Sequence, residues 1–332
     1  MNLTKVELLW TYKCSLNCKG CAMNSGEKNS RTVNEWKIGI DNFIRHGASF
    51  MAVYGAEPLE DFDKLPEVIN YAETNALNVS LITSYSDYQE KLKTLYENNL
   101  KSLTTSYYLD KAFDKSTQIK NDQALKMLNY FQSLDTGCNN IRNVAVIVTV
   151  TRNNIKDLVE FVKNMTYRGI WVFLDFLHFK RHSFGTKCSG KYNPKLHTIT
   201  PFAADRSGWE RVSDIMFELA DLASLGFLVN MSYPVAEEIK RQKAVADWKC
   251  EKSSVFPSWI TVDPFGNIHP CDDFRCGNEY DIINFPDDLE RLKESWKTKI
   301  DRLCKGCLWT THIQSHAIKH GFLSDNSFIK DE

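Results

Sequence analysis

Short β-prone runs alternate with longer amphipathic stretches over the first two thirds of this 332-residue chain. The runs are rich in β-branched and aromatic residues, and the stretches have apolar residues spaced three and four apart. This alternation favours parallel strands joined by crossover helices. We therefore predict six strands, at 6–10, 50–54, 78–83, 102–108, 143–150 and 170–176, and five helices, at 34–46, 65–76, 88–98, 122–133 and 155–167.

Six parallel strands with helices outside them suit a partial barrel. We expect an α/β chain with a partial (β/α)6 TIM-like barrel over residues 1–235 and a smaller C-terminal unit over 236–332. In parallel α/β architectures the reactive groups gather at the carboxyl ends of the strands. Motifs that directly follow a predicted strand are therefore the first candidates for a functional site.

Net charge, hydropathy and cysteine content limit the kinds of protein that this chain can be. A net charge of -1 argues against an overall electrostatic grip on nucleic acid or on an anionic membrane. No signal peptide is apparent and no apolar stretch is long enough to cross a bilayer, which indicates a cytoplasmic protein. Ten cysteines in such a protein are more typical of metal binding than of disulfides.

Three of these cysteines, Cys14, Cys18 and Cys21, follow the first predicted strand at spacings of four and three. A short loop can fold three thiolates around one face of an iron-sulfur cube, which leaves one iron open to a small molecule. Zinc is the alternative, but it requires a fourth ligand, and neither Cys nor His occurs between Cys21 and His46. The spacing therefore favours the cluster.

The C-x3-C-x2-C arrangement resembles the signature of the radical S-adenosylmethionine (SAM) enzymes. In that family the open iron chelates SAM, the reduced cluster splits its sulfonium bond, and the resulting 5'-deoxyadenosyl radical abstracts a substrate hydrogen. The resemblance implies a [4Fe-4S] cluster at these three cysteines, SAM as cofactor, and a low-potential electron donor such as flavodoxin or ferredoxin as partner. One departure is Gly20, which stands where the family often has an aromatic residue that packs on the adenine.

The segment Gly55, Ala56, Glu57 and Pro58 follows the second predicted strand. It is similar to the glycine-glycine-glutamate-proline segment of the same enzymes, whose backbone binds the methionine amine of SAM. A glycine leaving a strand permits unusual backbone angles and close approach to a ligand, and the proline stiffens the turn. Without the cysteine loop, a plain strand-to-helix turn is the simpler interpretation. Ala56 departs from the family's second glycine and restricts positive backbone angles.

Family members use polar residues at the ends of the fourth and fifth strands to hold the ribose and the methionine carboxylate of SAM. Ser106 and Tyr108 occupy the first position, where a Ser-x-Asp pattern is frequent, and Thr149 and Asn154 occupy the second. A helix cap or a solvated loop explains each of them equally well. Candidate proton carriers near the same rim are Tyr107, Tyr108, Asp175 and His178.

Four more cysteines, Cys250, Cys271, Cys304 and Cys307, lie in the last third of the chain. Two β-prone runs around 263–267 predict a hairpin before Cys271, and a polar helix at 289–302 precedes the last pair. The arrangement, with Gly266 five positions before Cys271, resembles the twitch module, a shortened relative of the SPASM domain that holds one auxiliary [4Fe-4S] cluster. A structural zinc ribbon is the alternative, and Cys276 can replace or supplement Cys271 as a ligand.

The substrate leaves a weaker signature. The segment 176–204 has lysines, arginine and histidines but no acidic residue, so it would attract a phosphate or carboxylate if it covered the barrel mouth, although a solvated loop explains it as well. The leading hypothesis is a radical SAM oxidoreductase or maturase acting on a peptide side chain or a sugar-like small molecule, with the auxiliary cluster accepting an electron or binding substrate. The alternatives are radical modification of a nucleotide or nucleic-acid base, and a non-enzymatic iron-sulfur or zinc protein.

Overall fold

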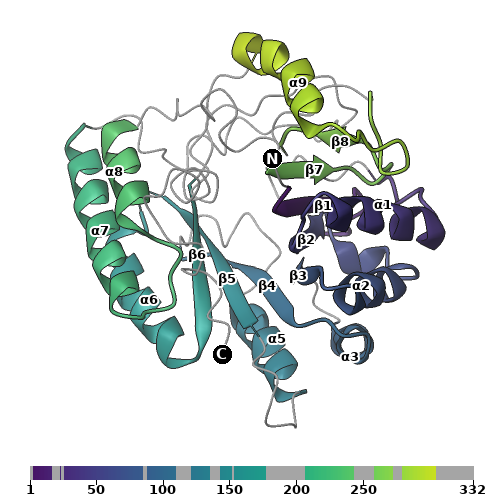
Figure 1. Ribbon diagram of the computed structural model, residues 1–332. Coiled ribbons are helices and arrows are strands. Elements are labelled where there is room, and N and C mark those ends of the chain that lie inside the picture. Colours follow the sequence, from purple (N-terminus) through teal and green to yellow (C-terminus); the bar gives the residue numbers. More distant parts are fainter. Residues whose placement is uncertain are drawn as a thin grey trace.

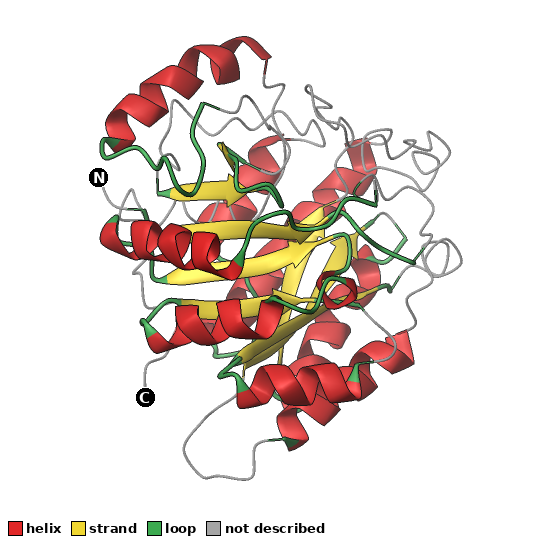
Figure 2. Cartoon of the chain, turned by 90° about the vertical axis from the view of Figure 1, so that its right-hand side faces the viewer, coloured by secondary structure: helices red, strands yellow, loops and turns green. Residues whose placement is uncertain are grey.

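The computed structural model describes residues 3–16, 23, 26–84, 88–109, 121–134, 143–151, 153–176, 206–242, 258–271 and 279–303. Eight strands in these ranges form one sheet in the order β6-β5-β4-β3-β2-β1-β7-β8. The sheet is curved, and the helices lie on its outer side (Figures 1 and 2). An α/β fold with a mostly parallel sheet is therefore confirmed.

The six predicted strands are all present, each within one residue of its predicted ends. Neighbouring strands among these six pair in parallel. A strand that is covered on both faces consists largely of apolar or β-branched residues. This is why the six strands can be recognised in the sequence. Their bounds are β1 Lys5–Thr11, β2 Phe50–Gly55, β3 Asn78–Ile82, β4 Ser102–Tyr107, β5 Asn143–Val150 and β6 Ile170–Phe176.

The five predicted helices are also confirmed: α1 Val33–Arg45, α2 Leu65–Thr74, α3 Gln89–Glu97, α5 Asn121–Ser133 and α6 Leu158–Tyr167, the last preceded by the 3-10 turn η2 Ile155–Asp157. The first of them begins with a capping box. Glu35 donates its backbone N–H to the Thr32 hydroxyl over 3.2 Å, and the Glu35 carboxylate accepts the Thr32 N–H over 2.8 Å. These two bonds satisfy backbone donors that the first turn leaves open.

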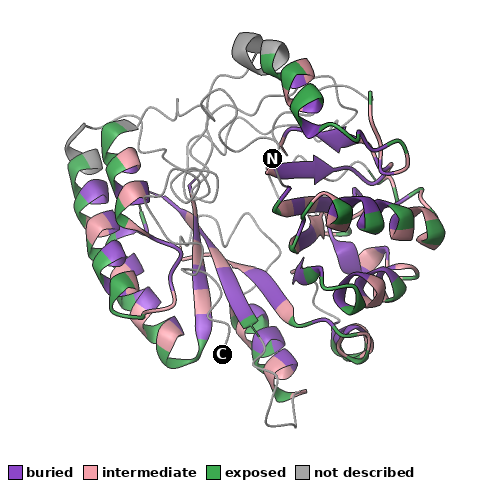
Figure 3. Cartoon of the chain, viewed as in Figure 1, coloured by how far each residue is buried: buried purple, intermediate pink, exposed green. Residues whose placement is uncertain are grey.

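Alternate residues of each strand point to opposite sides of the sheet. On the helix side they are apolar and belong to one buried core, in which Trp10 of β1 packs on Trp36 of α1 with ring centroids 5.8 Å apart. On the opposite side several are polar, among them Glu7, Ser80 and Thr104. Figure 3 shows the strands as the most buried part of the described chain. The polar inner face leads upward to the carboxyl ends of the strands, where the predicted site lies.

Two helices follow β6 that the sequence patterns did not predict, α7 Arg206–Ser224 and α8 Tyr233–Gln242. Between them the chain returns to the sheet, where Val229 makes a parallel bridge to Val172 of β6. Leu174 donates its N–H to the side chain of the buried Asn230 over 2.7 Å. This return covers the outer edge of β6.

The predicted C-terminal hairpin is present as β7 Trp259–Val262 and β8 Ile268–His269, which pair antiparallel. β7 also pairs in parallel with β1, with Lys5 opposite Trp259 and Leu8 opposite Val262. The hairpin thus continues the main sheet. Strands from both sides of the predicted boundary near residue 235 therefore belong to the same sheet. The predicted helix at 289–302 appears as α9 Leu289–Leu303. No helix in the described ranges combines the length and apolar character needed to span a membrane.

Candidate active site at the carboxyl end of the first strand

The loop that carries the cysteine triplet is closed at its base. Tyr12 donates its backbone N–H to the Glu27 carbonyl over 2.9 Å, and Gly26 donates back to the Tyr12 carbonyl over 3.0 Å. Cys14 is partly exposed within this loop, and its thiol contacts the Leu16 carbonyl over 3.6 Å. Cys18 and Cys21 fall outside the described residues, as does Gly20. A thiol on a loop tied at both ends is a donor that fits an iron-sulfur cluster.

The predicted SAM-binding segment lies directly against this loop. Ala56 donates its backbone N–H to the Thr11 carbonyl over 2.9 Å, and Glu57 donates to the Lys13 carbonyl over 3.1 Å. Gly55 has a φ of +145°, and a Cβ at this position would lie 2.5 Å from the Thr11 carbonyl oxygen. Glycine is therefore required by the close approach of the two backbones. Ala56 is not among the residues with positive φ, so an alanine is compatible with this turn.

The side chain of Glu57 ties the end of β2 to the end of β3. It is 1% exposed, and its carboxylate accepts the N–H of Leu59 over 3.1 Å, the N–H of Ser84 over 2.9 Å and the hydroxyl of Thr83. Burial raises the pKa of Glu57 to about 7, while these hydrogen bonds act in the opposite direction. Pro58 follows as the first residue of the 3-10 turn η1 Pro58–Glu60. The carboxyl group of Glu57 therefore has a bracing role.

Glu60 holds both sequence neighbours of Cys14. Its carboxylate accepts the backbone N–H of Ser15 over 2.6 Å and also the Ser15 hydroxyl. Its backbone carbonyl accepts the Lys13 ammonium over 3.1 Å. Sequence reasoning missed this residue, because nothing in its local pattern distinguishes it from any acidic residue in a turn.

The same stretch after β2 also holds the end of the loop. Asp61 accepts the N–H of Asn29 on its carboxylate over 2.7 Å and the indole N–H of Trp10 on its carbonyl over 2.6 Å. The Lys64 ammonium donates to the carbonyls of Asn29 and Arg31 over 2.8 and 2.6 Å. We call residues 57–64 the β2 clamp. It contacts the start and the end of the cysteine loop, and so fixes the frame within which Cys14 lies.

The predicted residues on β4 and β5 lie on two faces of the sheet. Strand register places Ser106, Thr149 and Asp175 on the inner face near the carboxyl ends, with Thr149 directly opposite Asp175. Tyr107 points to the helix side, where its ring packs 4.9 Å from Phe161 and burial raises its pKa. The backbone of Tyr108 is held by the Asn121 side chain, which accepts its N–H over 2.8 Å and donates to its carbonyl over 2.7 Å. His178 lies outside the described residues.

Asn154 has a clear local task. Its buried side chain accepts the Thr151 N–H over 2.9 Å and donates to the Thr149 carbonyl over 2.8 Å, so it shapes the turn that leaves β5. Contact of Asn154 or Thr149 with SAM remains a prediction.

Among the predicted ligands of the second metal, Cys271 is described and lies two residues beyond β8. The turn before it is built on Asp263, whose carboxylate accepts the backbone N–H groups of Phe265 and Asn267, each over 2.9 Å, and contacts His269 over 3.2 Å. Burial acts to raise the pKa of Asp263, but these hydrogen bonds outweigh it, so the pKa is lowered. The other predicted positions, Cys250, Cys276, Cys304 and Cys307, lie outside the described residues. Within the described part of the chain, no three His, Cys, Asp or Glu residues gather into a metal cage.

A curved, mostly parallel sheet with a cysteine loop at the end of its first strand defines the α/β fold of this chain. Several solved structures share this fold. SuiB of Streptococcus suis bound to S-adenosylmethionine superimposes with a TM-score of 0.61 at 14% identity, over 100% of this chain and 77% of SuiB. The same protein bound to its precursor peptide SuiA gives 0.59 over 92% and 72% of the two chains, again at 14% identity.

A further structure, native anSMEcpe with bound AdoMet and the Cp18Cys peptide, gives a TM-score of 0.52 at 16% identity over 97% of each chain. SuiB and anSMEcpe carry bound S-adenosylmethionine in these structures, and this chain shares their fold. No family model matches the chain. Over 83 residues, 25% of this chain, the sequence is 34% identical to an S-adenosylmethionine-dependent nucleotide dehydratase of Selenomonas ruminantium, and the match spans 30% of that relative.

Proposed function

We propose that this chain is a radical SAM enzyme. The observation that carries the proposal is the contact between the loop of Cys14 and the backbone of Gly55 to Glu57, two segments that lie more than 40 residues apart in the sequence. A [4Fe-4S] cluster held by Cys14, Cys18 and Cys21 would supply the electron that cleaves SAM to methionine and the 5'-deoxyadenosyl radical, which then takes a hydrogen atom from the substrate. The fold shared with SuiB and anSMEcpe supports the same assignment.

Several residues hold the backbone around Cys14 or line the inner face of the sheet next to it. Glu60 and Lys13 hold the backbone on both sides of Cys14. Gly55 lets the backbone of β2 approach the cysteine loop closely. The backbone of residues 55–58, the predicted SAM-binding segment, therefore lies next to that loop. Ser106, Thr149 and Asp175 share the inner face above which a substrate would lie. Asp175 is the candidate proton carrier that this register favours.

We further propose an auxiliary [4Fe-4S] cluster at Cys250, Cys271, Cys304 and Cys307 in a twitch-like C-terminal unit. Support comes from the hairpin, because β7 pairs with β1 and so brings the segment of Cys271 to the strand that leads into Cys14. A flavodoxin or ferredoxin is the proposed electron donor, and the cytoplasm the proposed location. The proposed substrate is a peptide side chain, which the peptides present in the SuiB and anSMEcpe structures support, or a sugar-like metabolite.

The class is tested by anaerobic reconstitution with iron and sulfide, reduction with dithionite and quantification of 5'-deoxyadenosine formed from SAM. We expect iron-dependent formation that Cys14→Ala abolishes and Cys138→Ala leaves unchanged, because Cys138 is outside both predicted ligand sets. A protein that binds one zinc and forms no 5'-deoxyadenosine would refute the proposal and favour the zinc alternative.

A nucleotide is the second candidate substrate, favoured by the match to the nucleotide dehydratase. The rate of SAM cleavage distinguishes the two candidate substrates. A bound substrate changes this rate because it gives a hydrogen atom to the 5'-deoxyadenosyl radical. Nucleoside triphosphates and short peptides are to be tested side by side with the reconstituted enzyme. A nucleic-acid base as substrate would add a steep dependence of affinity on salt, since phosphate contacts release counterions.

A further inference from the structure

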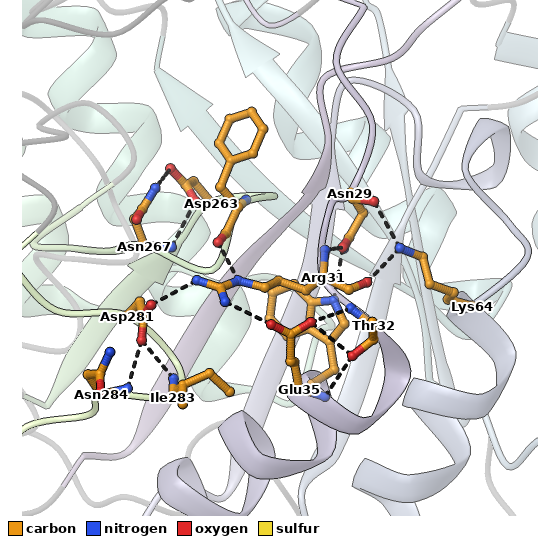
Figure 4. A network of polar contacts seen from close by, with 12 residues as sticks. Asn29, Arg31, Thr32, Glu35, Lys64, Asp263, Asn267, Asp281, Ile283 and Asn284 are labelled. Atoms are coloured by element: carbon orange, nitrogen blue, oxygen red, sulfur yellow. Dashed lines mark hydrogen bonds and ion pairs between the residues drawn. The ribbon is translucent and has the colours of Figure 1, made fainter.

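Arg31, just after the cysteine loop, joins three parts of the chain through one guanidinium group (Figure 4). Its Nη1 donates to Glu35 of α1 over 2.9 Å, and its Nη2 donates to Asp281 over 2.8 Å. Its Nε donates to the carbonyl of Phe265, in the turn between β7 and β8, over 2.6 Å. The side chain is 20% exposed. The planar fork of arginine is suited to holding several acceptors in fixed directions, whereas lysine is not.

The C-terminal partners are themselves fixed in place. Asp281 accepts the N–H groups of Ile283 and Asn284 on its other oxygen, over 2.9 and 2.7 Å. Ile282 donates its N–H to the Gly266 carbonyl over 2.9 Å. Figure 4 shows Asp281 and the turn at Asp263 approaching the guanidinium from the side opposite Glu35. Arg31 therefore meets a prepared acceptor site.

Gly266 gives a second and independent indication. Its φ is +83°, and a Cβ built on it would lie 2.7 Å from Arg31 Nε and 3.1 Å from a side-chain carbon of Ile282. The turn therefore requires glycine for two reasons, its backbone angle and the passage of the arginine. The sequence singled out Gly266 only by its spacing to Cys271; the structure shows that this glycine makes room for a side chain from the cysteine loop.

We propose that Arg31 is a positioning residue that fixes the end of the cysteine loop relative to the hairpin that leads to Cys271. Its backbone carbonyl is held by Lys64 of the β2 clamp, and its side chain is held by the C-terminal segment. The base of the loop that carries Cys14 and the hairpin that leads to Cys271 are thereby held together. This inference rests on the proposed function for its catalytic meaning, but its structural content is testable without any metal.

The test compares hydrogen exchange of the full chain in Arg31→Met, Arg31→Lys and Gly266→Ala. We expect amide exchange at 26–31, 263–267 and 281–284 to rise about tenfold in Arg31→Met, because a charge-assisted hydrogen bond is lost at each partner. Arg31→Lys should fall between it and the parent. The matched control is Arg45→Met, which removes an exposed pair with Asp287 at 3.4 Å and should leave these segments unchanged.

Gly266→Ala displaces the arginine without removing its charge, so its effect and that of Arg31→Met should be less than additive in the double variant. In the reconstituted protein, the same variants should change the microwave power saturation of the reduced cluster's electron paramagnetic resonance signal, which depends on distance to the second cluster.

Two results separate the inference from the proposed function. Exchange that stays at the parental rate in Arg31→Met, as in Arg45→Met, would overturn the positioning role whatever the iron content. Raised exchange in a protein that binds no cluster would support the positioning role and overturn the proposed function.

Discussion

The Glu60 carboxylate accepts the backbone N–H of Ser15, the residue next to Cys14, over 2.6 Å. A carboxylate from the turn after the second strand thus holds the cysteine loop of the first. Because it orients a predicted metal ligand from outside the ligand set, its loss should weaken metal binding without removing a donor atom.

Glu60→Gln should therefore lower the affinity for the cluster by about 10-fold, since both Ser15 donors bond the same carboxylate oxygen and a neutral amide oxygen in its place is a weaker acceptor. The measurement is iron per chain after reconstitution and desalting. Glu97→Gln, at an exposed position on α3, is the matched control. Equal iron content in both variants would show that Ser15 needs no charged acceptor.

Gly55→Ala should destabilise the fold by about 2–4 kcal/mol, because the new Cβ would overlap the Thr11 carbonyl and the backbone angle is unfavourable. The control is Gly226→Ala, where φ is +90° but nothing lies within 4 Å of the added atom. We expect a cost of about 1 kcal/mol there, from backbone strain alone. Urea unfolding measures both free energies, and similar values would rule out the overlap.

The pKa of Glu57, raised by burial to about 7, makes stability depend on pH. Below pH 4.5 the group is protonated in both the folded and unfolded states. As the pH rises to 7 the unfolded chain releases a proton that the folded chain keeps, so the free energy of unfolding should fall by about 3 kcal/mol and then level off.

Glu57→Gln, which cannot ionise, should lack this contribution. The check is the difference between the parent and the variant in urea unfolding at pH 4.5, 6 and 7.5. A difference that stays constant with pH would mean that Glu57 ionises at its ordinary pKa in the folded protein.

Asn154→Ala should destabilise the SAM-free protein by about 2–3 kcal/mol, because the buried Thr151 N–H and the Thr149 carbonyl lose their partner. Asn164→Ala, on an exposed turn of α6, should have almost no effect. Unfolding is measured without SAM, and SAM affinity separately. If Asn154→Ala lost only SAM affinity, a ligand role would replace the turn-forming role.

The strands and helices up to Phe176 were predictable because each has its own local sequence pattern, an apolar run for a strand or a repeat of three to four residues for a helix. Strands such as Asn143–Val150 are apolar along their length, and helices such as Val33–Arg45 repeat every three to four residues. The predicted start of α1 at Asn34 lies one residue after the observed start at Val33, because the capping box of Thr32 and Glu35 sets the first helical residue. The helices α7 and α8 were missed because the regular alternation of strand and helix ends at β6, and between them the chain returns to the sheet at Val229 by an isolated bridge instead of a strand.

Motifs of fixed spacing single out Cys14 and Gly55, and the structure brings their two segments into contact, whereas their roles toward a cluster and SAM stay predictions. Glu60 and Arg31 were not predictable, because their roles depend on partners brought by the fold. Arg31 meets Asp281 across 250 residues of sequence, and no local rule connects the two. The requirement for glycine at position 266 was likewise not predictable, because it arises from the Arg31 side chain that the fold places against it.

The pairing of Lys5 with Trp259 has a consequence for biosynthesis. One side of β1 can be covered as soon as β2 emerges from the ribosome, but the other side stays bare until translation has passed residue 262. During that interval the nascent chain presents an unpaired strand next to its cysteine-bearing loop, a surface prone to wrong partners. The strand next to the cysteine loop therefore gains its second neighbour only after residues 259–262 have been made.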